Sequence, residues 1–479
     1  MPARHARITP QSSHGQLAAA LAALREQFAV NAAFPAEALA EAEAATAPTA
    51  ELDLRDLPFA TLDPPGSRDL DQAFHLERGD GTRGAAYTLR YAIADVPGVV
   101  RPGGALDAEV RTRGQTLYLP DGSVPLHPPV LSEGRASLLP GEDRTAYVWT
   151  ITLDAAGAQL DARVERATVR SRAQLDYPSA QAAIERGDAE GPLALLAEVG
   201  RLRIEQERRR GGASLNLPDE EIVRDPSGYR IVRRLPLPVE EWNAQLSLLT
   251  GMAAGRMMID GGIGILRTMP APEKSALREF RARVAALGLP WASGVPYGDY
   301  LRQAPRDTAQ GAAVLHAASG LFRGADYTAF SGAAPEHSEQ AAIAAPYAHV
   351  TAPLRRLVDR WGLVICAALC ADRPVPAWAR DSLDELPALM RTSSARAGQL
   401  DSAALDRVEA ALLRDRVGEA FEAVVLDVRG ARARVQIAEP PVTGQCRLPE
   451  DTAYGAGTAI RVRVVRAEIA TGTIELVAA

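Results

Sequence analysis

Three aspartates close together are the first residues of this sequence that could carry out chemistry. Asp63, Asp69 and Asp71 lie in the segment TLDPPGSRDLDQAFHL, interrupted by a Pro-Pro-Gly-Ser turn. An extended chain would point Asp69 and Asp71 to the same face, and the turn could fold Asp63 back towards them. Clustered carboxylates repel one another unless a cation neutralises them. Oxygen ligands without His or Cys favour Mg²⁺ or Mn²⁺.

A carboxylate centre of this kind suits phosphodiester hydrolysis. Two ions about 4 Å apart can activate water and stabilise the leaving oxygen. A solvated acidic loop is the competing interpretation, because aspartates are common in turns. The spacing alone leaves both interpretations open.

Length and composition describe a globular chain of several domains. The 479 residues are enough for two to four domains. The sequence lacks an apolar run of membrane-spanning length and its N-terminus lacks the apolar core of a secretory signal, so we expect a cytoplasmic protein without a membrane partner. A net charge of −7 does not exclude nucleic acid, since a groove needs only local positive potential.

The elements that must position the aspartates fall into three regions. Residues 1–50 are alanine-rich with apolar positions at helical spacing, which predicts a short helical segment or small domain. Residues 51–415 are expected to form a mixed α/β catalytic domain, with strands at AYTLRYAIADV (86–96) and AYVWTITLD (146–154) and mostly helices after about 175. Residues 416–479 alternate polar and apolar residues between glycine turns, which predicts a small all-β barrel of the oligonucleotide-binding type, with a β-sandwich as the competitor.

Several long motifs, in order, resemble the ribonuclease II/ribonuclease R family. They are DPPGSRDLD with the following YAIADVPGVV, the stretch RPGGALDAEVRTRGQTLYLPDGSVPLHPPVLSEGRASLLPGEDR, LNLPDEEIV (215–223) and APYAHVTAPLRRLVDRW (345–361). The C-terminal segment resembles the family's S1-type RNA-binding barrel. The resemblance implies an RNB-type catalytic domain that degrades RNA with bound metal.

The same resemblance implies a ligand set for Mg²⁺, with Mn²⁺ as the alternative. The family surrounds its metal ions with four aspartates, and Asp63, Asp69 and Asp71 match the first three. Gln72 stands at the fourth position, where it can offer a carbonyl oxygen but no negative charge. Asp71 matches the aspartate on which catalysis in the family depends most.

The block APYAHVTAPLRRLVDRW is expected to contribute a cation. Pro353 suits the first position of a helix, so we expect Arg355 in the first helical turn, where amide groups and the dipole favour phosphate. The resemblance implies that Arg355 contacts the scissile phosphate and that Arg356 steadies the RNA backbone. A surface pair of Arg355 with Asp359 is the alternative on helical spacing alone. His349 is expected to be a hydrogen-bonded structural residue.

Further RNA contacts are expected outside this block. Tyr118 matches an aromatic position on which the family stacks the 3′-terminal bases, and Glu409 resembles a family glutamate near the active site. In the predicted barrel, alternation places Arg432 and Arg434 on one face, where they could follow an RNA backbone.

Together these features predict a hydrolytic, metal-dependent 3′→5′ exoribonuclease that acts as a monomer on single-stranded RNA and releases nucleoside 5′-monophosphates. With about 50 helical residues where relatives carry cold-shock barrels, structured RNA could approach more closely. Two alternatives remain. Gln72, and leucines where the family has paired glutamates in NAQLSLLTGMAAG, would suit a catalytically impaired RNA-end-binding protein. An endoribonuclease could use the same metal site.

Overall fold

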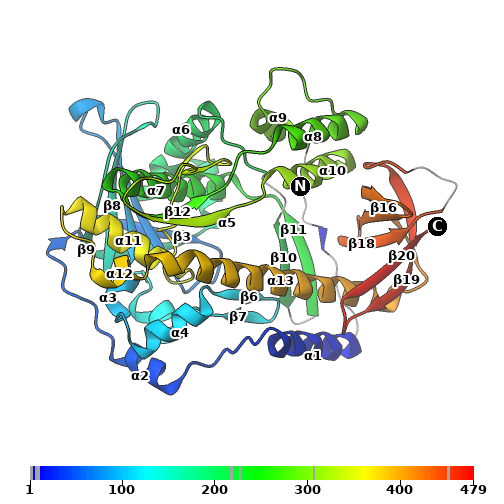
Figure 1. Cartoon of the computed structure of the whole chain (residues 1–479), viewed down its shortest axis with the longest axis horizontal. Helices are drawn as coiled ribbons and strands as arrows, with labels where there is room; N and C mark the ends of the chain where they lie inside the picture. The colour runs from blue at the N-terminus through cyan, green and yellow to red at the C-terminus, as the bar shows by residue number, and fades with distance from the viewer. Residues whose placement is uncertain (1–3, 6–10, 216–218, 226–227, 306–307, 450–453) are drawn as a thin grey trace.

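A sheet whose pairings close into a ring forms the centre of the larger part of the molecule (Figure 1). In this computed structural model, which describes residues 4–5, 11–215, 219–225, 228–305, 308–449 and 454–479, the strand order is β2-β9-β3-β4-β5-β8. The long β9 pairs antiparallel with β8 along its first part and parallel with β3 along its last, which closes the ring. The strands are β2 (Leu52–Asp53), β3 (Phe59–Asp63), β4 (Gln72–Arg78), β5 (Tyr87–Ala94), β8 (Asp143–Leu153) and β9 (Gln159–Asp176).

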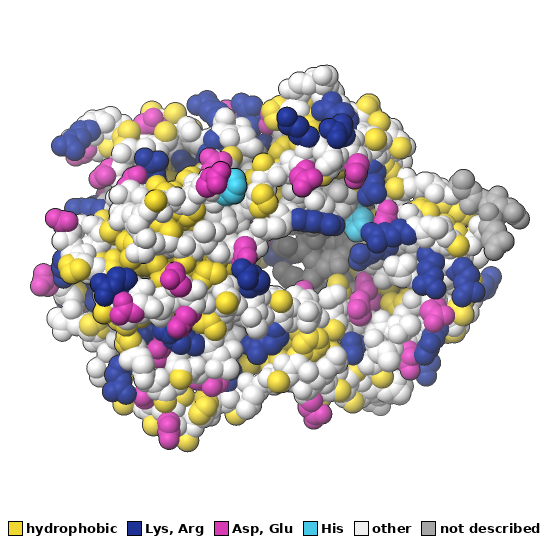
Figure 2. Space-filling model, in the orientation of Figure 1, with side chains coloured by type: hydrophobic (Ala, Val, Ile, Leu, Met, Phe, Trp, Pro, Cys, Tyr) yellow, Lys and Arg dark blue, Asp and Glu magenta, His cyan; other side chains and the backbone are white. Residues whose placement is uncertain are grey.

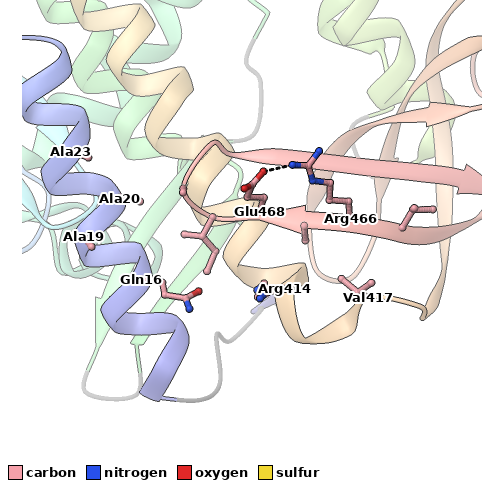
Figure 3. Close-up of a pocket in the computed structure, with 12 residues that line it drawn as sticks. Gln16, Ala19, Ala20, Ala23, Arg414, Val417, Arg466 and Glu468 are labelled. Carbon is pink, nitrogen blue, oxygen red and sulfur yellow. Dashed lines mark hydrogen bonds and ion pairs between the residues drawn. The ribbon is translucent and has the colours of Figure 1, made fainter.

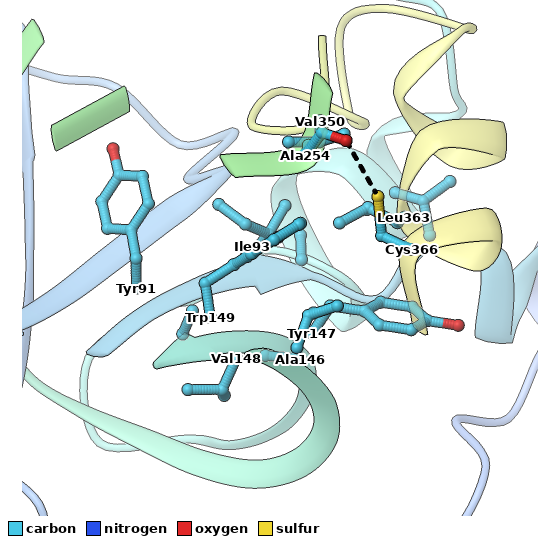
Figure 4. Packing of buried hydrophobic residues seen from close by; sticks show 14 of the residues in the cluster. Tyr91, Ile93, Ala146, Tyr147, Val148, Trp149, Ala254, Val350, Leu363 and Cys366 are labelled. Carbon is cyan, nitrogen blue, oxygen red and sulfur yellow. Dashed lines mark hydrogen bonds between the residues drawn. The ribbon is translucent and has the colours of Figure 1, made fainter. Parts of the chain in front are cut away.

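The predicted strands at 86–96 and 146–154 are therefore confirmed as β5 and β8, although β8 begins earlier, at Asp143. Trp149 and Tyr91 are among the largest fully buried side chains. Figure 4 shows the apolar side chains of both strands packed beneath Leu363 and Cys366. This core fixes the end of β3 and the start of β4, and the aspartate segment connects the two.

Helices α5 (Tyr177–Arg186), α6 (Leu196–Arg209), α7 (Pro238–Gly261) and α11 (Asp359–Cys370) pack around this sheet. Small residues on α7 let another segment run directly against it. A Cβ atom on Gly251 would lie 2.1 Å from the ring of Tyr347, and the Ala348 amide donates to the Gly251 carbonyl at 2.9 Å. The glycine therefore seats the segment that leads into TAPLRRLVDRW.

Short elements complete this part of the chain. The hairpin of β6 and β7 and the pairs β12–β13 and β14–β15 are separate two-stranded sheets. Strands β1, β11 and β10 form a three-stranded sheet, in this order. LNLPDEEIV is described from Asp219 onwards as β10, and its residues 216–218 lie outside the described residues. These elements are β1 (Arg4–His5), α2 (Ala36–Ala44), α3 (Val96–Val99), α4 (Ala105–Arg113), β6 (Leu117–Leu119), β7 (Gly122–Val124), β10 (Asp219–Asp225), β11 (Gly228–Arg234), β12 (Ile263–Thr268), β13 (Asp326–Ser331), β14 (Glu339–Gln340), β15 (Ala345–Pro346) and α12 (Ala377–Asp381).

A helical module with its own hydrophobic core lies between the sheet and the C-terminal region. It consists of α8 (Lys274–Ala286), α9 (Tyr297–Gln303) and α10 (Ala309–Ala318), around Phe280, Val284 and Leu301. Helix α10 packs against the first strand of the C-terminal barrel. The module therefore joins the body to the barrel on one side (Figure 1).

The C-terminal region is a closed five-stranded barrel, which confirms the predicted barrel and excludes the sandwich. The strands are β16 (Ala420–Arg429), β17 (Arg432–Ile437), β18 (Val442–Arg447), β19 (Ala459–Glu468) and β20 (Thr473–Ala478). Alternation buries Ala433, Val435 and Ile437 inside the barrel.

Helix α13 (Leu386–Leu413) joins the body to the barrel on the other side, and α1 (Gln11–Gln27) packs along it. The expected helical character of residues 1–50 is confirmed by α1 and α2. They do not form a domain of their own, because α2 packs on α4 and α1 on α13. None of the helices in the described residues combines the length and apolar character needed to cross a membrane.

Candidate active site

Asp71 is the most buried carboxylate of the aspartate segment. It lies directly before β4, and its side chain is 5% exposed. One carboxylate oxygen accepts a hydrogen bond from the Leu354 amide at 2.7 Å, and the other lies 3.4 Å from Nε of Arg355. Burial raises the pKa of Asp71 to about 8, although Arg355 acts in the opposite direction. A carboxylate held in this way needs more positive charge than Arg355 alone supplies.

Asp63 and Asp69 complete the acidic segment. Asp63 ends β3, and its Oδ2 is buried without a hydrogen-bond partner. Burial, with a further contribution from Asp69, raises the pKa of Asp63 to about 7. Asp69 also raises the pKa of Asp71. The turn therefore brings the three carboxylates close enough to interact, as the sequence predicts.

The donor set can be compared with what a divalent cation requires. Within the described part of the chain, no three His, Cys, Asp or Glu side chains already lie in the arrangement of a metal site. The unpartnered Oδ2 of Asp63 and the raised pKa values of Asp63 and Asp71 nevertheless suit a cation, which would compensate the cost of burying charge. Oxygen-only donors fit Mg²⁺ or Mn²⁺.

Gln72 makes two hydrogen bonds within the protein. Its Nε2 donates to the Thr351 carbonyl at 2.7 Å, and its Oε1 accepts a hydrogen bond from the Tyr91 hydroxyl. These bonds make Gln72 a tie between β4, β5 and the segment of Thr351. Since an amide oxygen has two lone pairs, a metal contact of Gln72 stays a prediction.

Arg355 lies in a turn, which corrects its predicted place in the first turn of a helix. Helix α11 begins only at Asp359. The alternative pairing of Arg355 with Asp359 is also wrong, because Asp359 is bound by Arg356 and accepts from the Ala352 amide at 2.7 Å. The half-exposed Arg355 side chain is directed to Asp71 instead. The turn is held by Asp359 together with backbone hydrogen bonds from the Arg355 and Arg356 amides to the Ala352 carbonyl, at 3.3 and 3.0 Å.

Arg356 and His349 stand behind this turn. Nε and Nη2 of Arg356 donate to the two carboxylate oxygens of Asp359, and a role of Arg356 on the RNA backbone remains a prediction. Nδ1 of His349 shares a 2.7 Å hydrogen bond with the Tyr327 hydroxyl. Burial and the nearby arginines lower the pKa of His349 well below its usual value, which keeps the ring neutral. These contacts agree with the predicted structural role of His349.

Tyr118 lies beside the acidic segment, as predicted. It occupies the middle of β6, is 56% exposed, and is close enough to Arg355, Asp69 and Asp71 for all three to affect the pKa of its hydroxyl. Burial of the hydroxyl has the largest effect and raises that pKa. An exposed ring next to the Arg355 guanidinium offers a surface on which a base can stack.

Glu409 lies away from this group. Its side chain is 4% exposed and accepts a hydrogen bond from the Thr443 amide of β18 at 2.8 Å, which ties α13 to the barrel. Ser393 of the same helix donates to the Arg113 carbonyl, near the turn of Arg355. Glu409 follows sixteen residues later, about 24 Å along the helix. The predicted position of Glu409 near the active site is therefore wrong.

Arg432 and Arg434 share an exposed face of β17, as alternation predicts. Arg434 is near enough to His316 of α10 and Asp406 of α13 to affect the pKa of both. Figure 2 shows a hollow in this face of the molecule, between α10 and α13, with basic side chains at its rim. A shallow, open depression follows one face of α13 from Ser394 to Asp406.

Three residues that hold the site in place by hydrogen bonds were not predicted from the sequence. Asp359 organises the turn, Tyr91 holds Gln72, and Tyr327 holds His349. Asp359 is part of the motif APYAHVTAPLRRLVDRW, so its presence there was a usable signal. The two tyrosines carry no such signal, because their hydroxyls meet partners distant in the sequence.

Comparison with known proteins places these residues in a wider context. Residues 51–365 match the RNB domain family, and residues 419–479 match the RNase II-type exonuclease C-terminal S1 domain. Ribonuclease R of Escherichia coli (strain K12) is 29% identical over 330 residues, which cover 64% of this chain and 39% of that protein. The probable exosome complex exonuclease RRP44 of Caenorhabditis elegans is 27% identical over 329 residues, which cover 65% of this chain and 34% of that protein. The chain thus matches about two fifths or less of the length of these relatives.

Solved structures share the fold at lower sequence identity. RNase R of Mycoplasma genitalium in complex with ribose-methylated single-stranded RNA has a TM-score of 0.86 and 19% identity, covering 97% of this chain and 78% of that one. Yeast Ssd1, a pseudonuclease, has a TM-score of 0.68 and 18% identity, covering 87% and 53%. Since one of these is a pseudonuclease, the site residues and not the fold must decide activity.

Proposed function

The chain belongs to the RNB-domain family, and on this premise we propose that it is an exoribonuclease that hydrolyses single-stranded RNA from the 3′ end. The observation that carries the proposal is the meeting of Asp71 with the Leu354 amide and Arg355, which lie more than 280 residues away in the sequence. Buried carboxylates beside a half-exposed guanidinium are suited to a phosphodiester. The names of the relatives, ribonuclease R and exonuclease, support the same activity.

Asp63, Asp69 and Asp71 would hold Mg²⁺, or Mn²⁺, and bound metal would supply Lewis-acid stabilisation of charge on the phosphate. The Leu354 amide fixes the rotamer of Asp71. Arg355 can turn from Asp71 to a phosphoryl oxygen, since half of its side chain is exposed. A guanidinium in this place stabilises the negative charge that develops in the transition state.

RNA would reach this site along the inner surface of the molecule. The exposed face of Arg432 and Arg434 and the depression along α13 offer a route from the barrel towards the turn of Arg355. Tyr118 would stack on a terminal base, a contact of about 1–3 kcal/mol that tolerates any sequence. A single strand fits such a route, and the structure of the Mycoplasma relative contains single-stranded RNA.

The finer parts of the proposal concern products and assembly. Attack of water on the terminal phosphodiester would release nucleoside 5′-monophosphates one after another, and a monomer contains all the residues that this requires. The proposal includes close approach of structured RNA to the entrance, past α1 and α2, which lie on the body. A 3′-tailed hairpin tests this point, because close approach predicts stalling only a few nucleotides from the duplex.

The central experiment follows 5′-labelled RNA incubated with Mg²⁺ and, separately, with chelator. Stepwise shortening that needs the metal is expected, and internal fragments would indicate an endonuclease. Asp71→Asn should abolish shortening while RNA binding remains. Asp188→Asn is the matched control, because Asp188 is an exposed aspartate in a surface pair with Arg186. Full activity of Asp71→Asn would refute the mechanism.

An RNA-end-binding protein without activity is the second candidate. It is favoured by the engagement of Gln72 with Tyr91 and Thr351 and by the lack of a preformed metal cluster in the described residues. Tight binding of RNA with unchanged length in Mg²⁺ and Mn²⁺ would establish this function in place of hydrolysis.

A further inference from the structure

The hairpin that carries Tyr118 is a weak element by itself. It has three residues in each strand, β6 and β7, and within the part of the chain that the structure describes it pairs with no other strand. An isolated two-stranded hairpin is at best marginally stable in water. Leu117 and Val124 are buried on one face, and Tyr118 is exposed on the other. The position of Tyr118 therefore depends on what covers the buried face.

Helix α1 is part of that cover. Its Leu17, Leu21 and Leu24 recur at helical spacing, so they share one face of the helix. All three are buried in the same hydrophobic cluster as Leu117 and Val124 of the hairpin. Helix α13 contributes Leu400 and Ala404 to this cluster. The hairpin thus shares one hydrophobic core with α1 and α13, and its strand β6 packs on α13.

A salt bridge links α1 directly to the turn of the hairpin. The two terminal nitrogens of Arg25 lie 2.8 and 2.6 Å from the two carboxylate oxygens of Asp121. The side chains are 25% and 19% exposed, so solvent screens the pair only partly. Two parallel hydrogen bonds fix direction as well as distance. Asp121 joins β6 to β7, so this contact restrains the hairpin at its tip.

On its other side α1 is less tightly packed. A pocket of about 610 Å³ separates part of α1, including Ala19 and Ala23, from the barrel edge at Arg466 and Glu468 (Figure 3). Helix α1 packs mainly on α13, and Arg25 links it to the hairpin through Asp121. This arrangement gives α1 a more specific task than attachment of the barrel.

We propose that α1, through Arg25, is a positioning element that holds Tyr118 at the 3′ end of bound RNA. The inference rests on the proposed function, in which Tyr118 stacks on a terminal base. Stacking requires the ring to be held parallel to the base, and a hairpin that is free at its tip would hold it less well. Loss of the salt bridge therefore weakens the grip on short RNA, where few other contacts exist.

The test measures binding of a short, fluorescently labelled oligoribonucleotide with a free 3′ end, in the Asp71→Asn background so that no hydrolysis occurs. Tyr118→Ala should weaken binding by about fivefold or more, from the energy of one stacked base. Arg25→Ala should weaken binding roughly threefold. In a Tyr118→Ala background, Arg25→Ala should change binding by less than about 1.5-fold, because coupled residues are not additive.

Three further variants separate positioning from general stability. Asp121→Asn removes the same salt bridge from the hairpin side and should reproduce the effect of Arg25→Ala with α1 unchanged. Arg25→Asp combined with Asp121→Arg should restore binding. Arg78→Ala is the matched control, because Arg78 makes an equally two-pronged pair with Glu198, at 3.0 and 2.8 Å, outside the hairpin.

Equal weakening by Arg25→Ala in both backgrounds would overturn the inference, since α1 would then act on the whole fold. Unchanged binding in both Arg25→Ala and Asp121→Asn would overturn it as well. If Tyr118→Ala binds like its parent, the assigned stacking contact is wrong and the inference falls with it. Failure of the exonuclease proposal has a separate signature, which is an unshortened 5′-labelled RNA with the unmodified protein.

Discussion

Replacement of Asp71 by asparagine should stabilise the metal-free protein while it removes activity. The asparagine keeps an oxygen that can accept from the Leu354 amide, but it carries no charge into a site that is 5% exposed. Burial raises the pKa of Asp71 to about 8 in the folded protein, whereas an aspartate in an unfolded chain has a pKa of about 3.9. Ionised Asp71 is therefore a cost to the fold.

The pH dependence follows from proton binding. Between about pH 4 and pH 8 the folded protein holds a proton on Asp71 that the unfolded chain has lost. The stabilisation that this proton gives the folded protein is thus fully present at low pH and declines as the pH rises through this window. Each pKa unit corresponds to about 1.4 kcal/mol. Because relaxation of the site offsets part of the cost, we expect about 3 kcal/mol between pH 5 and pH 8.5.

Urea unfolding in chelator at these two pH values measures the effect. The free energy of unfolding of Asp71→Asn, relative to the unmodified protein, should rise by about 3 kcal/mol from pH 5 to pH 8.5. Asp63 titrates in both proteins, so its contribution to the free energy of unfolding cancels in this difference. Asp188→Asn, at an exposed site, should show no such change. A difference between the two proteins that stays constant with pH would refute the assignment of a raised pKa to Asp71.

Three further predictions concern neighbouring contacts. Arg355→Lys should lower the turnover number by roughly 10²-fold with little change in RNA affinity, because a transition-state contact is lost; an equal loss in affinity would contradict this. Gln72→Glu should lower the melting temperature, with a cost of about 1–3 kcal/mol, because a carboxylate cannot donate to the Thr351 carbonyl; unchanged stability would show that this tie is dispensable. Glu409→Ala should loosen the barrel, seen as faster amide hydrogen exchange at Thr443, and should leave turnover on a mononucleotide ester unchanged; slowed chemistry would restore Glu409 to the active site.

Local patterns were sufficient for much of the fold. β-Branched and aromatic residues predict β5 and β8, whose central residues are buried on both faces, and alternation predicts most of the barrel. Strand β18 lacks this pattern. Its sequence VTGQCR contains Gly444 and pairs parallel with β20, a partner that only the closed barrel supplies. The motif with Asp63, Asp69 and Asp71 was recognisable for a similar reason, since its spacing is local.

Long-range contacts explain the remaining differences. Pro353 predicts a helix start, but the Leu354 amide is taken by Asp71 and the Ala352 amide by Asp359. The segment is nevertheless a turn, and α11 begins only at Asp359. The position of the Gln72 side chain is likewise fixed by hydrogen bonds with Tyr91 and Thr351, neither of which is near it in the sequence. Propensity gives way wherever a buried side chain claims a backbone amide.

The packing of α1 on α13 has a consequence for synthesis of the chain. Leu17, Leu21 and Leu24 leave the ribosome early, whereas Leu400 and Val408, which share their core, are made near the end. At 5–20 residues per second the interval is roughly 20–80 s. During that time an apolar helical face lacks its native cover. Chains that carry this face are candidates for binding by chaperones. Once α13 and the barrel have left the ribosome and folded, they would cover the face.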